Sequence, residues 1–226
     1  MYRMISAMID ATPTSLDAIG LPTVVVVDDD ISIRESLELL ITSAGWQPLL
    51  FESAQTFLEA PPTSLPSCLV LDVNMPGLNG LDLQSMISVS GKRMPIIFVS
   101  GFGDVPMTVR ALKGGALDFL TKPIDSAALL DAIRSALSRS EALLRESEEL
   151  LRLQRCYDAL TRREREVMVR VVKGFLNKQV AFELNISEIT VKAHRGQVMR
   201  KMAARSLPEL VNMAATLRLE NDSEIS

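Results

Sequence analysis

Short apolar runs alternate with amphipathic stretches through the first half of the 226-residue chain. The runs are too short for helices and are bounded by turn-forming residues, which is typical of buried strands. The stretches between them carry apolar residues at intervals of three or four and predict helices. The predicted strands are residues 23–27, 47–51, 68–72, 95–100 and 117–121, and the predicted helices are residues 31–44, 53–60, 81–89, about 105–112 and one from 126. Since parallel neighbours need crossover helices, this alternation predicts an α/β domain with a doubly wound, five-stranded parallel sheet.

The pattern changes after residue 137. Residues 138–156 are strongly polar, and leucines repeat every seven residues, from Leu143 to Leu150 and from Leu144 to Leu151. This pattern predicts a helical linker with a narrow apolar seam. About two heptads are compatible with a short coiled coil or with a solvated helix, and both alternatives stay open.

Residues 157–219 have helical periodicity throughout and predict an all-α unit of four helices. The helix at 177–184, the Asn185-Ile186 turn and a longer helix from Ser187 have the proportions of a helix-turn-helix. The apolar positions expected on the core side of the longer helix are Ile189, Val191, Val198 and Met202.

Composition excludes several other classes of protein. Hydrophobic residues make up 47% and charged residues 23% of the chain, as in folded globular proteins. No apolar run approaches the ~20 residues needed to cross a membrane. Cys68 and Cys156 are far apart and lack metal-binding spacing, so we expect reduced thiols in a cytoplasmic protein and no zinc site. Residues 1–21 lack the apolar segment of a secretory signal and predict a disordered extension, and residues 220–226 form an acidic tail.

Charge is distributed unevenly along the chain. Residues 21–137 carry 7 Lys and Arg against 13 Asp and Glu, a net charge of −6. Residues 157–219 carry 12 basic against 6 acidic residues, a net charge of +6. The basic unit is therefore a candidate for nucleic-acid binding, although the pI of the whole chain is near 5.2.

Five chemically active residues follow or end the predicted strands. They are Asp28, Asp29, Asp72, Ser100 and Lys122. Parallel strands all end at one edge of their sheet, so these side chains should converge. Clustered carboxylates repel one another and need a cation, and hard oxygen ligands favour Mg²⁺. An ionised Asp72 could then attack phosphorus, with Lys122 and Ser100 contacting the phosphoryl oxygens.

Each of these residues also has an ordinary structural explanation. Lys122 before a proline can belong to a surface turn, and Ser100 can be a hydroxyl at a strand end. Asp72 and the Asp28–Asp30 run can cap helices. Such explanations account for one or two of the residues but not for their coincidence at one sheet edge.

The motifs VVVVDDD, LVLDVNMPGLNG and IIFVSGFGDVPMTVRALKGGALDFLTKP, together with residues 161–202, resemble a two-component response regulator of the FixJ type. The resemblance covers roughly residues 21–219. It implies a CheY-like receiver of flavodoxin-like fold at 22–137, the helical linker at 138–156 and a LuxR-type helix-turn-helix domain at 157–219. Its implied partners are a sensor histidine kinase, double-stranded DNA, a second copy of the chain after phosphorylation, and RNA polymerase.

The resemblance assigns roles around the acidic residues. Asp72 is the expected phospho-acceptor. Asp29, Asp72 and the backbone carbonyl of Asn74 are expected to ligate Mg²⁺, and Asp28 is expected to bind it through water.

The same resemblance assigns the phosphoryl contacts and the switch. Ser100 and Lys122 hold the phosphoryl group, and Phe119 is the switch aromatic that turns inward when Ser100 moves. The Lys122-Pro123 bond is expected to be cis. Gly114 stands where alanine is usual and is expected to loosen the end of its helix.

In the basic unit, TVKAHRGQVMRKM resembles the LuxR-type recognition helix. By that match Lys192, Ala193 and Gly196 face base edges, whereas the expected phosphate contacts are Lys178, Thr190 and Arg195. His194 is expected to pack in the helix or touch a phosphate rather than to act as a catalyst. One such unit makes few contacts, so a dimer on two half-sites is expected.

Two other functions compete with this prediction. An Asp-nucleophile phosphohydrolase would use the same carboxylates, but the sequence contains no evident general acid or substrate cap. A phosphate-independent DNA-binding protein would use the first domain only as a dimerisation scaffold. The complete set of acidic residues argues against that second alternative.

Overall fold

The predicted parallel sheet is present in the structure, a computed structural model that describes residues 20–61, 65–90, 93–101 and 103–219. The acidic tail and nearly all of the predicted extension lie outside these residues. Two compact units divide the chain between Leu143 and Leu144. Within the described residues, no helix has both the length and the apolar character needed to cross a membrane.

The sheet of the first unit has the strand order β2-β1-β3-β4-β5, and all neighbouring strands are parallel. The strands are β1 (Thr23–Val27), β2 (Gln47–Phe51), β3 (Ser67–Asp72), β4 (Ile96–Ser100) and β5 (Asp118–Thr121). The order changes direction between β1 and β3, which is where open α/β sheets form a crevice at the carboxyl ends of their strands. The predicted strands are confirmed to within one residue at each end.

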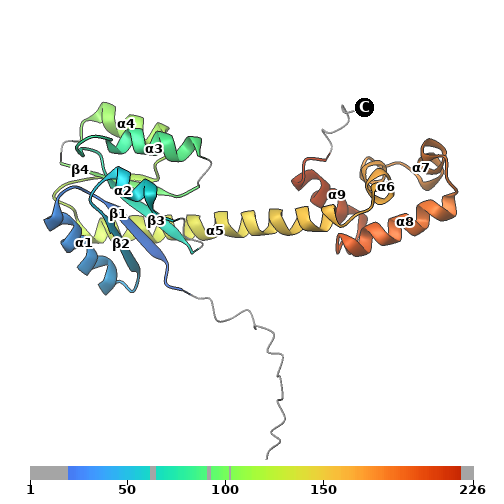
Figure 1. The fold of residues 1–226 in the computed structure, drawn as a ribbon, viewed down its shortest axis with the longest axis horizontal. Coiled ribbons are helices and arrows are strands. Elements are labelled where there is room, and N and C mark those ends of the chain that lie inside the picture. Colours follow the sequence, from blue (N-terminus) through green and yellow to red (C-terminus); the bar gives the residue numbers. More distant parts are fainter. Residues whose placement is uncertain (1–19, 62–64, 91–92, 102, 220–226) are drawn as a thin grey trace, which may run out of the picture. The chain divides into compact units, whose positions relative to one another are not determined.

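Helices cover both faces of this sheet. They are α1 (Ile31–Ser43), α2 (Ala54–Glu59), α3 (Gly80–Val89), α4 (Val105–Lys113) and the first turns of α5 (Ser126–Asp158). Side chains alternate across each strand, so Val24 and Val26 belong to the core that includes α1 and α5. Val25 and Val27 belong to the opposite core, which α3 and α4 complete (Figure 1). The predicted doubly wound architecture is therefore confirmed.

The predicted linker is not a separate element, because α5 continues without interruption from Ser126 to Asp158. Its packing on the sheet also extends past residue 137. The buried Ser140 Oγ accepts a hydrogen bond of 2.9 Å from the backbone N–H of Ser67, the first residue of β3. Further along the helix, Leu150 and Leu151 are exposed. The structure thus confirms that residues 138–156 are helical, and the seam positions Leu143 and Leu144 are only partly exposed.

Gly114 follows α4 and lies against a buried glutamine of α3. Gln84 Nε2 donates a hydrogen bond of 3.0 Å to the carbonyl oxygen of Ala111 in α4. A Cβ atom at Gly114 would lie 2.6 Å from Gln84 Oε1. Gly114 therefore provides the space that Gln84 occupies, and Gln84 in turn joins α3 to the end of α4.

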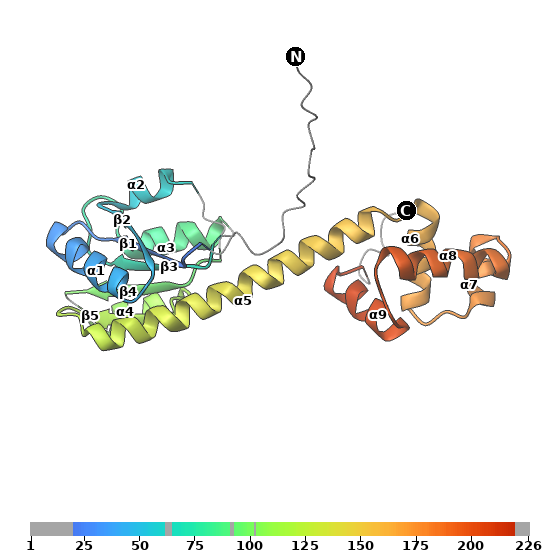
Figure 2. The ribbon, with the colours of Figure 1, turned by 90° about the horizontal axis from the view of Figure 1, so that it is seen from below.

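The second unit consists of four helices with their own core, as predicted, together with the last turns of α5 (Figure 2). The four are α6 (Arg162–Val172), α7 (Asn177–Leu184), α8 (Glu188–Lys201) and α9 (Leu207–Thr216). Thr161 and Glu164 form a capping box at the start of α6. On α8, Val191, Val198 and Met202 are buried as predicted. The prediction for Ile189 was wrong, because its side chain is 80% exposed.

Candidate functional site

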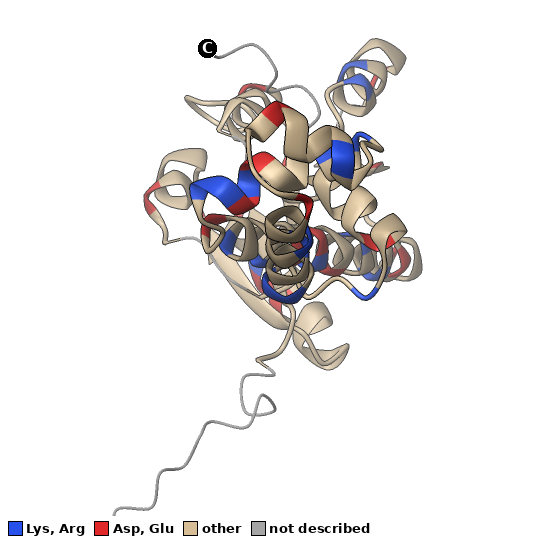
Figure 3. Ribbon diagram, turned by 90° about the vertical axis from the view of Figure 1, so that its right-hand side faces the viewer, with Lys and Arg blue, Asp and Glu red and all other residues tan. Residues whose placement is uncertain are grey.

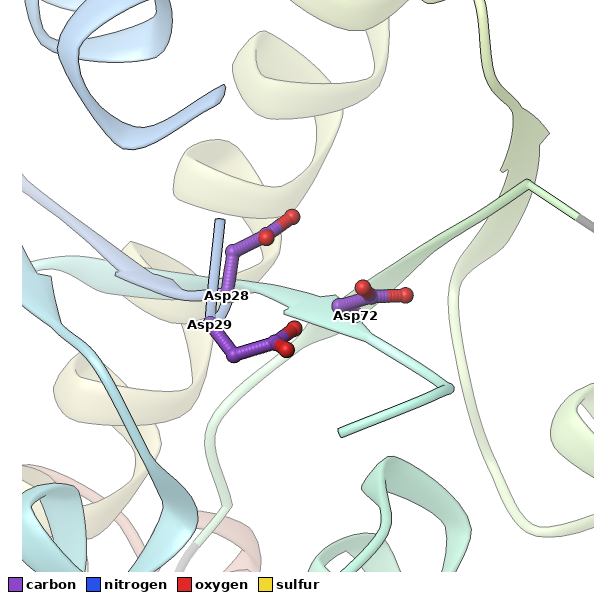
Figure 4. Close-up of side chains that lie close together, drawn as sticks. All are labelled: Asp28, Asp29 and Asp72. Atoms are coloured by element: carbon purple, nitrogen blue, oxygen red, sulfur yellow. The ribbon is translucent and has the colours of Figure 1, made fainter. Parts of the chain in front are cut away.

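Three carboxylates converge where β1 and β3 end. Asp28 directly follows β1, and Asp72 is the last residue of β3. The register pairs Val27 with Leu71, so the residues that follow in each strand are also neighbours. Carboxylate oxygens of Asp28, Asp29 and Asp72 all lie within 4.8 Å of one another (Figure 4). Asp28 and Asp72 are only 2% and 6% exposed, whereas Asp29 is open to solvent.

Lys122 joins two of these carboxylates. Its Nζ lies 2.7 Å from Asp28 Oδ2 and 3.0 Å from Asp72 Oδ2. The residue follows β5, and its backbone N–H donates to the Ser100 carbonyl at 2.8 Å, which places the side chain over the sheet edge. The Lys122-Pro123 bond is cis, as predicted.

The pKa values of this ion pair reflect its burial. Burial raises the pKa of Asp28 above its ordinary value, although the bonds from Lys122 and from the Asp30 backbone act in the opposite direction. Burial acts to lower the pKa of Lys122, but its bonds to Asp28 and Asp72 outweigh this and leave that pKa raised. The cluster sets three carboxyl groups against the single ammonium group of Lys122.

Ser100 and Asn74 lie beside Asp72. Ser100 ends β4 and is fully buried. Asn74 Nδ2 donates to Ser100 Oγ at 3.3 Å, and the Asn74 backbone N–H donates to Asp72 Oδ1 at 3.2 Å. The structure thus gathers the Ser100 hydroxyl, Asp72 and the loop that follows it.

Phe119 lies on β5, two residues before Thr121, the register partner of Ser100, and is partly buried. It pairs with Phe98 of β4, and the centroids of the two rings are 6.3 Å apart. A Cβ atom at Gly103 would lie 2.8 Å from the Phe119 ring, so the ring also packs against the loop before α4.

Two residues beside the acidic cluster, Asp30 and Arg34, have structural roles in the fold. Asp30 is the N-cap of α1 and accepts a 2.8 Å bond from the Ser32 N–H. Arg34 was missed altogether, and its Nη1 donates to the Asp28 carbonyl oxygen at 2.6 Å. Its position one turn into α1 was the only available signal, because residues there lie close to the end of the preceding strand.

The predicted DNA-contacting residues of the second unit lie on α7 and α8. Asn185 between these helices adopts a left-handed conformation, with φ of 53°, and makes the tight turn. Lys and Arg occur on the helices of this unit with acidic residues among them (Figure 3). The predicted residues that are exposed are Lys178, Lys192, Ala193 and Gly196.

The other predicted contacts are partly buried, and Arg195 and Thr190 have hydrogen-bond partners in the protein. Arg195 Nη1 donates to Asn177 Oδ1 at 2.9 Å, which joins α8 to the start of α7. The Thr190 hydroxyl lies 2.8 Å from that of Ser187, the N-cap of α8. His194 is partly buried. Arg195 and Thr190 help to hold α8 in position, and any contact that they make with DNA is additional.

Two family models match the two units. One, described as "Response regulator receiver domain", matches residues 24–134. The other, described as "Bacterial regulatory proteins, luxR family", matches residues 158–214. The first match contains the whole acidic cluster with Ser100 and Lys122, and the second contains α7 and α8.

Named relatives extend over most of the chain. It is 48% identical over 194 residues to nodulation protein W of Bradyrhizobium diazoefficiens, covering 86% of each chain. It is 44% identical over 189 residues to transcriptional regulatory protein FixJ of Azorhizobium caulinodans, covering 84% of this chain and 90% of that one.

Solved structures agree with these relatives. The response regulator StyR has a TM-score of 0.78 at 44% identity, covering 87% of this chain and 99% of that one. Full-length FixJ from B. japonicum has a TM-score of 0.53 at 39% identity, covering 87% and 97%. The chain therefore belongs to the two-component response regulators of the FixJ type, in which a receiver domain is joined to a LuxR-type DNA-binding domain.

Proposed function

We propose that Asp72 accepts a phosphoryl group from a phosphohistidine on a sensor kinase, and that the phosphorylated chain dimerises and regulates transcription from double-stranded DNA. The observation that carries this proposal is the clustering of Asp28, Asp29 and Asp72 at the carboxyl edge of the sheet, where Lys122 forms ion pairs with Asp28 and Asp72. The family consists of transcription regulators rather than dedicated enzymes, and the chain's own chemistry would be limited to phosphorylation and dephosphorylation at Asp72.

The transfer is a substitution at phosphorus. A carboxylate oxygen of Asp72 forms the new O–P bond as the P–N bond breaks, and the kinase keeps its imidazole. Lys122 Nζ, 3.0 Å from Asp72 Oδ2, is placed to contact an oxygen of the incoming group. The Ser100 hydroxyl is close enough to the Asp72 loop to donate to another.

The donor set fits Mg²⁺. Asp29, Asp72 and the Asn74 carbonyl would hold the ion directly and Asp28 through water, because hard oxygen ligands with excess negative charge suit this cation. When bound, Mg²⁺ would offset the charge that develops on the phosphoryl oxygens.

Phosphorylation would be transmitted through Ser100 and Phe119. A Ser100 drawn toward the phosphoryl group would vacate space beside β5, and the partly buried Phe119 ring would turn into it. The face formed by α4, β5 and α5 is a suitable dimerisation surface, because apolar side chains of α4 and of the segment just before β5 are exposed. These are Val105, Val109, Leu112 and Leu117.

In the second unit, α8 would enter the major groove. Lys192, Ala193 and Gly196 would face base edges, while Lys178, Thr190, His194 and Arg195 would contact phosphates. The receiver pair would bring two such units onto two half-sites in the cytoplasm, where the complex would contact RNA polymerase.

The test compares wild type with Asp72→Asn, and uses Asp104→Asn as the matched control because Asp104 caps α4 outside the acidic cluster. Each protein is treated with a small-molecule phosphodonor and Mg²⁺, and intact mass, oligomeric mass and DNA affinity are measured. Wild type and Asp104→Asn should gain one phosphoryl group, dimerise and bind DNA more tightly, whereas Asp72→Asn should do none of these. Equal DNA binding by all three proteins, with and without the donor, would show that the receiver is only a scaffold.

A further inference from the structure

One face of α8 is exposed along about two turns. Ile189, Lys192, Ala193 and Gly196 are all exposed, and their spacing of three, four and seven residues places them on one side of the helix. The buried residues Val191, Val198 and Met202 occupy the other side. Ile189 therefore extends the stripe of predicted base-facing residues toward the N-terminus of the helix.

Ile189 is an unusual member of this stripe, since its apolar side chain is 80% exposed. It lies in the first turn of α8, two residues after the N-cap Ser187. In helix-turn-helix proteins the N-terminal residues of the second helix are the ones that contact base edges. The position of Ile189 is thus one that DNA would cover.

Gly196 allows the same face to approach another surface closely. No atom lies within 4 Å of the position that a Cβ at Gly196 would occupy. The glycine is therefore not required by packing inside the protein. Because Gly196 has no side chain, the backbone of α8 can come closer to the wall of a DNA groove at this point.

We propose that Ile189 determines specificity by packing on the C5-methyl group of a thymine in each half-site. The side chain has no hydrogen-bonding group, and the thymine methyl is the apolar feature that the major groove offers. This inference rests on the proposed binding of DNA by α8. It adds an apolar base contact at the N-terminal end of the predicted base-facing stripe.

The experiment removes the methyl group without changing any hydrogen bond. The full-length chain, treated with phosphodonor and Mg²⁺, first selects its preferred sequence from a randomised duplex library. Each thymine of that sequence is then replaced singly by deoxyuridine, and dissociation constants are measured at fixed salt for wild type and Ile189→Ala. Alanine is favourable in helices, so this variant should keep α8 folded, and circular dichroism checks that it does.

The matched control is Phe182→Ala. Phe182 is 87% exposed in the same unit but lies on α7, off the stripe of α8. For wild type and Phe182→Ala, one thymine in each half-site should show a loss of about fourfold on replacement by deoxyuridine, the value of burying one methyl group. Ile189→Ala should bind the duplex with thymine and the duplex with deoxyuridine at that position equally tightly.

Two results would overturn the inference while leaving the proposed function intact. One is a selected sequence in which no thymine-to-deoxyuridine replacement weakens the wild type. The other is an Ile189→Ala protein that keeps the full loss at the same thymine. A phosphorylated chain that selects no sequence at all would instead refute DNA recognition by α8, and the role of Ile189 with it.

Discussion

Each unit of this protein contains a buried carboxylate bonded to a lysine at the same distance. Asp28 in the receiver lies 2.7 Å from Lys122, and Glu164 in the DNA-binding unit lies 2.7 Å from Lys201. Their pKa values nevertheless move in opposite directions. That of Asp28 is raised and that of Glu164 is lowered.

The surroundings explain the difference. Burial raises the pKa of Asp28, its lysine is shared with Asp72, and the Asp72 carboxylate adds repulsion. Burial also opposes ionisation of Glu164, but Lys201 and the Thr161 backbone N–H, at 2.7 Å each, outweigh it. The second pair is balanced and serves the fold, whereas the receiver cluster keeps surplus negative charge suited to binding a cation.

Removing each lysine should therefore have different consequences. Lys201→Met leaves the Glu164 carboxylate buried without its cation and should lower the unfolding free energy of its unit by about 3 kcal/mol. Lys122→Met should destabilise the receiver by about 2 kcal/mol in EDTA, and Mg²⁺ should restore much of this by binding the native state. Hydrogen exchange of α6 and β3 amides in the intact chain measures both effects.

The proposed difference between the two lysines would be wrong if Mg²⁺ restored the stability of neither variant, or restored both to the same extent. A wild-type sample carried through the same EDTA and Mg²⁺ conditions serves as the control for general salt effects.

Gly114, just after α4, and Gly196, within α8, provide a second comparison. Gly114→Ala in the receiver should cost about 2 kcal/mol, because the new Cβ would lie 2.6 Å from Gln84 Oε1. In a Gln84→Ala background the same substitution should cost almost nothing, so chemical denaturation of the four proteins should give a clear coupling energy. Additive effects would show that Gln84 does not occupy that space in solution.

Gly196→Ala should change the unfolding free energy in the opposite direction, toward greater stability. Nothing lies within 4 Å of the new Cβ, so alanine should stabilise α8 by about 1 kcal/mol. If DNA approaches this face closely, the same variant should bind its selected duplex more weakly. Thermal unfolding measures the change in stability, and DNA titration measures the change in affinity. A more stable protein with unchanged affinity would place Gly196 away from the groove.

The smallest expected effect is on the pH dependence of α6. Because the pKa of Glu164 is below its ordinary value of 4.5, its ionisation stabilises the folded state above that value. The contribution should be lost as the pH falls through the lowered, folded-state pKa. The free energy of opening of α6 amides, obtained from hydrogen exchange corrected for its intrinsic pH dependence, should decline more for wild type than for Glu164→Gln as the pH falls from about 6 to about 3.5. Identical slopes would contradict this assignment.

Much of the candidate site could be predicted because it depends on topology. Once β1, β3, β4 and β5 are identified as parallel strands, the residues at their carboxyl ends must share an edge. The topology alone therefore predicts that Asp28, Asp29, Asp72, Ser100 and Lys122 lie together, although they come from distant parts of the chain. The helix-turn-helix was equally predictable, because caps and turn residues mark its boundaries.

The rotation of a helix about its own axis is harder to infer. Ile189 was expected in the core because an isoleucine near Val191 fits an apolar pattern. The two residues are two positions apart on α8, however, and their side chains point to opposite sides of the helix. Arg195 was expected on a phosphate, but its bond to Asn177 depends on how α7 and α8 pack.

The sequence by itself determined the order of the elements, the parallel sheet, the two units and the set of residues at the sheet edge, because these follow from local periodicity and chain connectivity. Only the tertiary structure decided which groups share a partner or a space: Lys122 between two carboxylates, Gln84 beside Gly114, and Ile189 in solvent. These outcomes depend on side-chain packing between elements that lie far apart in the chain, and no local pattern encodes that packing.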